Sequence, residues 1–297
     1  MFKSGVVAVV GRPNVGKSTL LNYLMKQKLT IISDKPQTTR NKITCILTTQ
    51  EAQIIFLDTP GLHKPRTKLG EYMVKVSVGS LREVDIVLFL VEASHPPGRG
   101  DGYVVDLLKQ AETRVFLVIN KIDLVEPLEL EGIIERYREL YDFSEVILVS
   151  AVNGTNVTLL QEKLVAHLPE GPKYYPEDMI TEQPERFVVS ELIREKILEQ
   201  TRDEVPHSVA VEVDEMKERK GKNMIYIRAN IFVERDSQKG IIVGNQGKML
   251  KEIGMKARQD IQVLLGCKVF LELWVKVQKD WRNRSKFLKD FGYHDRE

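Results

Sequence analysis

A glycine-rich loop between an apolar run and a helical pattern is the feature that most constrains this chain. Residues 11–18 read GRPNVGKS and fit the pattern G-x-x-x-x-G-K-[ST]. The apolar run at 5–10 predicts a buried strand, and residues 19–25 predict a helix. Loops of this kind turn backbone N–H groups around phosphates, while the lysine reaches the outer phosphates and the serine can ligate Mg²⁺. This stretch therefore predicts a nucleotide triphosphate site.

Apolar strand-like runs alternate with helical patterns from residue 4 to about residue 168, which predicts a mostly parallel sheet with helices on both faces. Only Gln50 and Glu51 separate the second and third runs, so we expect a hairpin and one antiparallel edge strand. The expected strands are 5–10, 42–49, 52–57, 86–91, 114–120 and 145–150, and the expected helices lie near 70–82, 102–112, 129–141 and 157–167.

Polar segments follow three of these strands, at the sheet edge where α/β folds bind their ligands. They read DTPG at 58–61, NKID at 120–123 and SAV at 150–152. Asp58 is suited to hold Mg²⁺ through a water, and the Gly61 N–H can donate to a terminal phosphate. Asp123 offers two carboxylate oxygens to N1–H and N2–H₂ of guanine, a donor pair that adenine lacks.

Three further residues of these segments can contact the base or its loop. The aliphatic stem of Lys121 can cover a face of the purine, and the Ala151 N–H can donate to guanine O6. Asn120 can brace either the phosphate loop or the base. Any one such residue can be a plain strand-end cap. Their joint occurrence behind a phosphate loop favours a guanine nucleotide over ATP.

These motifs together resemble the signature set of the translation-factor-related GTPases. The resemblance covers about the first 168 residues and implies GTP and GDP as ligands with Mg²⁺. It also implies a first switch in the segment PQTTR at 36–40, with Thr39 reaching the metal and Thr38 as second choice. The implied nucleotide-binding residues are Asn14, Val15, Gly16, Lys17, Ser18, Thr19, Asp58, Gly61, Asn120, Lys121, Asp123, Ser150, Ala151 and Val152, and the implied metal ligands are Ser18, Thr39 and, through water, Asp58.

Leu62 takes the place where many small GTPases have a glutamine that orients the attacking water. Leucine neither donates nor accepts a hydrogen bond, so we expect slow intrinsic hydrolysis, about 10⁻⁴–10⁻² s⁻¹, that RNA or a partner stimulates. The expected switch residues are thus Thr38, Thr39 and Leu62.

A proline-bearing polar stretch predicts a linker at 171–184 between a GTPase domain at 1–170 and a second domain at 185–297. We expect this linker to be semi-rigid because of its prolines. The second domain shows a helix at 185–201, strands at 205–216, 225–233 and 268–277, a hairpin loop at 217–223, and two helices around the glycine loop 244–247.

This order, with GNQG between two helices, resembles a KH domain of the bacterial arrangement and implies an α+β RNA-binding domain. In such domains the Gly-x-x-Gly loop clamps the backbone of about four unpaired nucleotides. We expect Ile241, Ile242 and Val243 to form an apolar floor for bases. The alternative is a plain interhelical turn with core isoleucines. The implied RNA-binding residues are Ile241, Gly244, Asn245, Gln246, Gly247 and Lys248.

Charge and cysteine usage add two expectations. Residues 239–297 hold 13 Lys and Arg against 7 Asp and Glu, a net of +6, which suggests nucleic acid or a membrane surface as partner. The tail 279–291 mixes aromatic and basic residues, so we expect a helix with packed aromatics and a basic face turned to RNA. Two distant cysteines are consistent with a reduced cytoplasmic compartment.

A GTPase of this motif set followed by a KH-type domain resembles the Era family of bacterial ribosome-assembly GTPases over essentially the whole chain. The resemblance implies binding to single-stranded RNA near the 3′ end of small-subunit rRNA, a role in small ribosomal subunit maturation, and a cytoplasmic monomer. Two alternatives stay open. One is a membrane-surface signalling GTPase that uses the basic C-terminal region and is partly membrane-peripheral, and the other is a non-enzymatic RNA-binding module with a structural nucleotide site.

Overall fold

The chain forms two compact units. The structure is a computed structural model that describes residues 1–82, 84–219 and 223–294. The first unit comprises Met1–Ile32, Gln37–Arg66 and Gly70–Glu182, and the second comprises Ser33–Pro36, Thr67–Leu69 and Gln183–Glu297.

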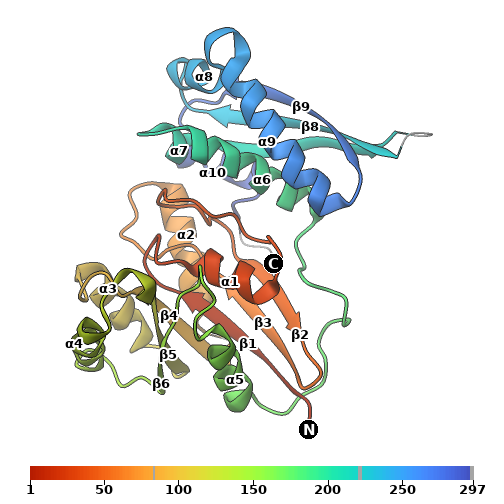
Figure 1. The fold of residues 1–297 in the computed structure, drawn as a ribbon. Coiled ribbons are helices and arrows are strands. Elements are labelled where there is room, and N and C mark those ends of the chain that lie inside the picture. Colours follow the sequence, from red (N-terminus) through yellow and green to blue (C-terminus); the bar gives the residue numbers. More distant parts are fainter. Residues whose placement is uncertain (83, 220–222, 295–297) are drawn as a thin grey trace. The chain divides into compact units, whose positions relative to one another are not determined.

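A six-stranded sheet in the order β2-β3-β1-β4-β5-β6 forms the centre of the first unit (Figure 1). Neighbouring strands are parallel except β2 and β3, which pair antiparallel across a short turn closed by the Thr49 N–H and the Ala52 carbonyl. This confirms the predicted mostly parallel sheet with one antiparallel edge. The strands are β1 (Lys3–Val10), β2 (Ile43–Thr48), β3 (Ala52–Asp58), β4 (Ile86–Glu92), β5 (Arg114–Asn120) and β6 (Glu145–Leu148).

Helices cover both faces of this sheet. Figure 1 shows α1 and α5 on one face, while α3 and α4 pack apolar side chains onto Phe89 and Leu117 on the other. Helix α3 begins three residues earlier than expected, because the Asp101 carboxylate accepts the N–H of Gly98 at 2.9 Å and caps the helix there. The helices are α1 (Lys17–Met25), α2 (Lys68–Gly79), α3 (Arg99–Leu108), α4 (Pro127–Arg138) and α5 (Val157–His167).

The segment after α5, where the sequence predicts a linker, lies along the edge strand β2. The Ile46 N–H donates to the Ile180 carbonyl at 2.8 Å. The buried side chain of Gln53 accepts the N–H groups of Tyr174 and Tyr175 at 2.7 and 2.9 Å, and donates to the Tyr175 carbonyl at 2.9 Å. Backbone and side-chain hydrogen bonds therefore fix this segment, beyond the stiffness that its prolines supply.

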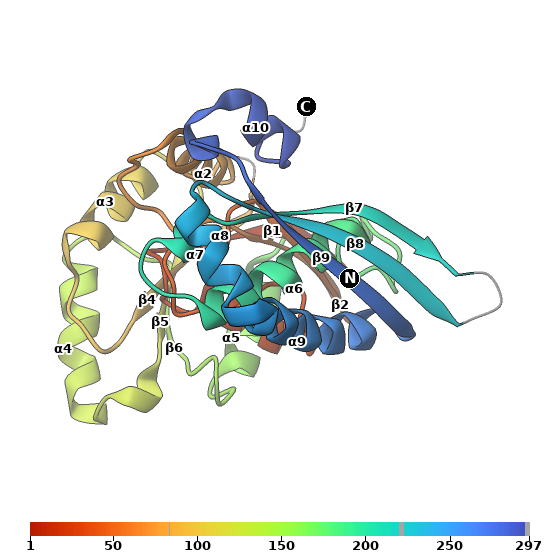
Figure 2. The same ribbon diagram turned by 90° about the horizontal axis from the view of Figure 1, so that it is seen from above.

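The second unit contains a three-stranded sheet, β7-β8-β9, in which β7 pairs antiparallel and β9 parallel with β8 (Figure 2). The order of elements confirms the α+β KH-type fold. The elements are α6 (Glu185–Gln200), α7 (Val205–Ser208), β7 (Ala210–Glu218), β8 (Met224–Val233), α8 (Asp236–Val243), α9 (Lys248–Leu265), β9 (Lys268–Val277) and α10 (Ser285–Asp290).

The predicted strand at 205–216 is wrong at its start. Residues 205–208 form the helical turn α7, since Pro206 lies at the start of the helix, where its missing N–H costs nothing. Residues 220–222 of the predicted hairpin loop lie outside the described residues.

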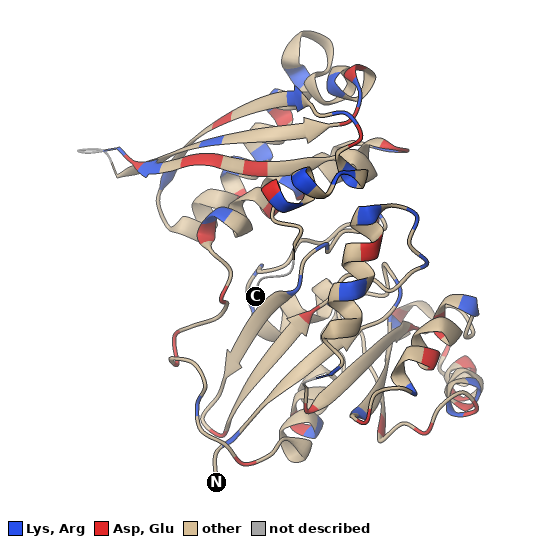
Figure 3. Ribbon diagram, turned by 180° about the vertical axis from the view of Figure 1, so that it is seen from behind, with Lys and Arg blue, Asp and Glu red and all other residues tan. Residues whose placement is uncertain are grey.

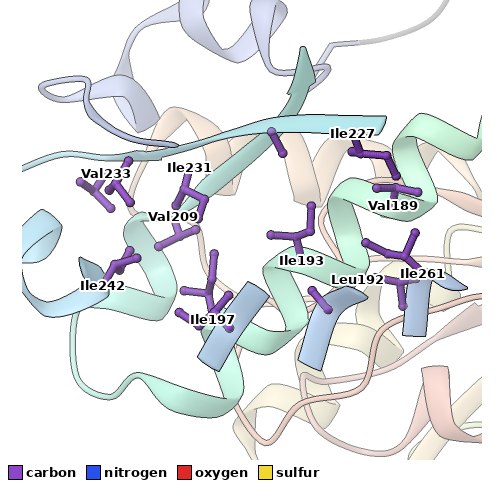
Figure 4. Close-up of a cluster of buried hydrophobic side chains, with 14 of the residues drawn as sticks. Val189, Leu192, Ile193, Ile197, Val209, Ile227, Ile231, Val233, Ile242 and Ile261 are labelled. Atoms are coloured by element: carbon purple, nitrogen blue, oxygen red, sulfur yellow. The ribbon is translucent and has the colours of Figure 1, made fainter. Parts of the chain in front are cut away.

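One apolar core joins the helices and the sheet of this unit (Figure 4). Ile193 and Ile197 of α6 face the strand residues Ile227 and Ile231, and all four side chains are fully buried. The alternation of apolar residues predicted for the strand at 225–233 therefore corresponds to one buried face.

The aromatic tail packs onto the same unit. Trp281 is fully buried, donates its Nε1–H to the Ser208 carbonyl at 2.8 Å, and contacts the rings of Phe291 and Tyr293. The helix that follows, α10, is shorter than the sequence suggests. Among the described residues, no helix is both long and apolar enough to cross a membrane.

Candidate functional site

The phosphate loop leaves β1 at the carboxyl edge of the sheet and ends in the first turn of α1. Lys17 is buried, and its Nζ donates to the carbonyls of Gly11 at 3.2 Å and Arg12 at 2.9 Å. Burial lowers the pKa of Lys17 to about 8, and the charge of Asp58 opposes this shift. The ammonium is thus held by loop carbonyls that phosphate oxygens can replace.

Ser18, Thr39 and Asp58, the three predicted metal ligands, lie together. The Ser18 hydroxyl donates to Asp58 Oδ2 at 3.0 Å and lies 3.2 Å from Thr39 Oγ1, which donates to the same carboxylate oxygen at 3.4 Å. Asp58 is fully buried. Burial raises the pKa of Asp58 to about 6, although Lys17 and both hydroxyls act in the opposite direction.

These residues fit a magnesium ion. Asp58 Oδ1 is buried and has no hydrogen-bond partner among the described residues. A buried carboxylate oxygen is normally paired, so this atom can accept a hydrogen bond or coordinate a cation. Hydroxyl and carboxylate oxygens are the ligands Mg²⁺ prefers, with waters and phosphates completing its shell. In the described ranges, no group of three or more His, Cys, Asp or Glu could hold a metal instead.

The predicted switch residues occupy different environments. Thr39 is buried beside Asp58, and Thr38 is half-buried. Leu62 is only 1 % exposed and belongs to the core under the sheet with Val10 and Phe89, while its N–H donates to the Gly11 carbonyl at 3.1 Å. Its side chain therefore packs in the core, a role that its place after Gly61 does not reveal.

Asn120 links the phosphate loop to the segment after β6 that is predicted to bind the base. Its Nδ2 donates to the Val15 carbonyl and its Oδ1 accepts the Ala151 N–H, both at 2.9 Å. Of the two roles predicted for Asn120, the geometry therefore favours bracing the loop. The Ala151 N–H, predicted to meet guanine O6, has a protein acceptor here. Asp123 lies exposed after β5.

The other predicted nucleotide residues lie in the phosphate loop, in the first turn of α1 and in the segments after β3 and β6. Ser150 is fully buried, and Val152, next to Ala151, is 71 % exposed. Asn14 is exposed, whereas Gly16, Thr19 and Gly61 are half-buried.

Sequence reasoning missed three charged residues at this edge. Glu92 Oε2 accepts from Lys121 Nζ at 2.6 Å. Arg12 lies between Glu92 and the buried Asp101. A signal was available, because Glu92 directly follows the apolar run 86–91 at the carboxyl end of its strand, where ligands bind.

The glycine loop between α8 and α9 presents several of the predicted RNA-binding residues to solvent. Ile241 is 50 % exposed, and Asn245, Gln246 and Lys248 are exposed. Gly244 has φ 69° and Gly247 has φ 77°, left-handed conformations that glycine adopts without strain.

The predicted apolar floor is wrong for Ile242. That side chain is fully buried in the core of the second unit, since it lies on the face of α8 turned to the sheet (Figure 4). Val243 also packs against this core. Of the three predicted floor residues, Ile241 is thus the one that is exposed.

Acidic and basic residues are mixed along the three strands of the second unit (Figure 3). Arg228, for example, pairs with Asp214 at 2.7 Å. The basic excess counted along the sequence therefore does not make this sheet uniformly positive, and the RNA prediction depends more on the glycine loop than on overall charge.

Comparison with known proteins adds independent findings. A family model described as 50S ribosome-binding GTPase matches residues 6–121, and a KH domain model matches residues 204–282. A crystal structure of Era in complex with MgGDPNP and nucleotides 1506–1542 of 16S ribosomal RNA is 42% identical, covers 99% of both chains and has a TM-score of 0.96. A crystal structure of a variant of Aquifex aeolicus Era bound to GDP·AlF4⁻ is also 42% identical, covers 98% of this chain and 99% of that one, and has a TM-score of 0.95. The chain belongs to the Era family of GTPases.

Proposed function

We propose that this protein binds GTP and GDP with Mg²⁺, hydrolyses GTP slowly, and binds single-stranded RNA near the 3′ end of small-subunit rRNA. The observation that carries the proposal is the cluster of Ser18, Thr39 and Asp58, with its buried carboxylate oxygen, behind the phosphate loop. When bound, the ion would neutralise charge on the phosphates during transfer to water. Asp123 selects guanine, and the Lys121 stem covers the base.

The RNA half of the proposal is supported by the Era complex with 16S nucleotides, whose identity of 42% extends over both units. The description of the matched GTPase family model names the large (50S) ribosomal subunit, whereas 16S RNA belongs to the small subunit. The Era complex is the better guide to the RNA partner, because its similarity includes the KH-type unit, whereas the family model matches residues 6–121 only. The proposed partner is therefore the small ribosomal subunit during its maturation, and a membrane-surface role finds no support in these relatives.

Further assignments complete the proposal. The domains are 1–170 and 185–297, with 171–184 between them, and the protein acts as a monomer. A cytoplasmic location is supported by Cys45 and Cys267, which are both free thiols.

Gly247→Asp is the test of the RNA site. A Cβ at Gly247 would meet no atom within 4 Å, whereas one at Gly244 would lie 2.6 Å from Met249 Cβ. The Gly247 variant therefore adds a negative charge to the loop without displacing α9, at a left-handed strain of about 1–2 kcal/mol. We expect at least about a tenfold loss of affinity for a single-stranded 3′-end RNA, because charge repulsion and lost backbone approach act together.

Gly266→Asp is the matched control. Gly266 follows the last residue of α9, has φ 64° and has equally open surroundings. Gly266→Asp therefore introduces the same strain and the same charge, but about 27 Å from the glycine loop, at the other end of the helix. Filter binding at fixed salt compares both variants, with GDP affinity as a check on the first unit. Equal RNA affinity of the two variants would contradict the proposed RNA site, and retained binding to anionic vesicles alone would favour the membrane alternative.

A further inference from the structure

Four charged side chains connect the phosphate loop to the base-binding segment. Asp101 Oδ1 accepts from Arg12 Nε at 2.9 Å, and Arg12 Nη2 lies 3.6 Å from Glu92 Oε1. The other oxygen of Glu92 accepts from Lys121 Nζ at 2.6 Å. The two acids and two bases therefore alternate, and each charge has an opposite neighbour.

Burial fixes Asp101, the first of these four side chains. Asp101 is fully buried, and its second oxygen accepts the N–H of Gly98, which caps α3. A buried carboxylate needs a cation and hydrogen bonds to stay ionised, and Arg12 with the Gly98 N–H supplies both. Arg12 is thereby held in one orientation, while its backbone carbonyl accepts from Lys17 at 2.9 Å.

Backbone geometry fixes Glu92 and Lys121, the other two charged residues. Glu92 is the last residue of β4 and stands opposite Asn120 in the parallel pairing with β5. Lys121, the next residue, has φ 64°, a left-handed conformation that turns the chain at the end of β5. The side chains of Glu92 and Lys121 are 20% and 29% exposed, so water screens their ion pair only in part.

We propose that Glu92 is a positioning residue that holds Lys121 so that the lysine stem covers the purine of the bound nucleotide, with Arg12 and Asp101 orienting Glu92. This inference rests on the proposed guanine-nucleotide site. A free lysine side chain loses rotamer entropy when it is immobilised. A lysine already held by Glu92 loses less when the base arrives, and this preorganisation favours the complex.

A double-mutant cycle on GDP binding tests the role. Fluorescently labelled GDP is titrated against the wild type, Glu92→Gln, Lys121→Met and the double variant, and dissociation rates are recorded. Methionine keeps an unbranched apolar stem but cannot pair with Glu92. We expect Glu92→Gln to raise the Kd about five- to tenfold, mainly through faster dissociation, and to change it less than twofold in the Lys121→Met background.

The other outcomes separate the possible failures. An equal loss from Glu92→Gln in both backgrounds would assign Glu92 a general structural role and overturn the inference, as would no loss in either. A wild type that binds no GDP would overturn the nucleotide site itself. Glu131→Gln, at an exposed position on α4, controls for the change in net charge. Arg12→Gln is a second variant, for which we expect a smaller rise in Kd that also vanishes with Lys121→Met.

Discussion

Thr39, in the predicted first switch, contacts two of the other predicted metal ligands, which predicts an effect on metal binding. Thr39 Oγ1 lies 3.2 Å from Ser18 Oγ and 3.4 Å from Asp58 Oδ2, where the ion would sit. We expect Thr39→Ala to weaken binding of a Mg²⁺–GTP analogue about tenfold or more and to leave Mg²⁺-free GDP binding nearly unchanged. Calorimetry with and without EDTA measures both affinities.

Thr38→Ala is the matched control for that comparison, because it removes the same groups one residue earlier in the chain. Its affinities should stay within about twofold of the wild type. A larger loss from Thr38→Ala than from Thr39→Ala would reverse the assignment.

We expect Leu62→Gln to lower the free energy of unfolding and to leave the rate of GTP hydrolysis unchanged. Leu62 is 1 % exposed in an apolar core, so an amide there is buried without partners and lowers the free energy of unfolding by about 2–4 kcal/mol. Urea unfolding measures this loss, and Leu62→Met, which conserves volume, should cost less than about 1.5 kcal/mol. A more than tenfold rise in single-turnover GTP hydrolysis by Leu62→Gln would show that this side chain can reach the water.

Sequence reasoning predicted Ser18, Thr39 and Asp58 as metal ligands, and the structure brings the three side chains together. The phosphate-loop residues could be predicted because phosphate binding needs those residue types at fixed spacing. Sequence reasoning misjudged Ile242, because an apolar residue beside a functional loop is equally compatible with the core. It stopped at Val91 because apolar runs define predicted strands, so the polar last residue of β4, Glu92, was left out.

At the level of elements, the edge of the first sheet depends on Gln53. Its buried side chain satisfies two N–H groups and one carbonyl of the segment at Tyr174 and Tyr175. Gln53→Leu leaves these three groups without partners, at a cost of about 1–3 kcal/mol in stability. We expect this cost to appear as local opening, in which the segment detaches from β2 while the rest of the sheet stays folded. We expect faster hydrogen exchange at the two tyrosine amides and faster protease cleavage between residues 171 and 182.

Amides of α1 should keep their exchange rates in the same variant, since the core of the sheet is untouched. Gln50→Leu, in the exposed turn between β2 and β3, controls for the change of side chain. Unchanged exchange at 174–175 would contradict the assigned role of Gln53.

Alternating patterns predicted the elements well, but their ends less so. The side-chain periods of strands and helices differ enough to be recognised in the sequence. The order of strands and helices, and with it the α/β class of the first unit and the α+β class of the second, could therefore be predicted. The start of α3 depends on a cap from Asp101, and α7 depends on Pro206, which are single-residue effects inside otherwise continuous patterns. Contacts between distant segments, such as Gln53 with Tyr174, leave no periodic signal.

For the whole molecule, a switch must couple its two ligands. If GTP with Mg²⁺ orders the loops at Thr39 and Gly61 and this state favours RNA, then RNA must favour GTP by the same factor, because the coupling free energy is reciprocal. We expect RNA to bind about 5- to 150-fold more tightly with a non-hydrolysable GTP analogue than with GDP. Titrating RNA into each nucleotide form, and each nucleotide into the RNA complex, at one salt concentration gives the two factors.

Thr39→Ala provides the decisive comparison for this coupling. The variant should bind RNA as the GDP form of the wild type does, whichever nucleotide is present, because its GTP state lacks the proposed threonine ligand of the metal. Gly247→Asp should weaken RNA binding in both nucleotide forms and preserve their ratio, since it changes the RNA loop alone. Equal RNA affinity of the two wild-type nucleotide forms would refute the coupling while leaving both binding sites intact.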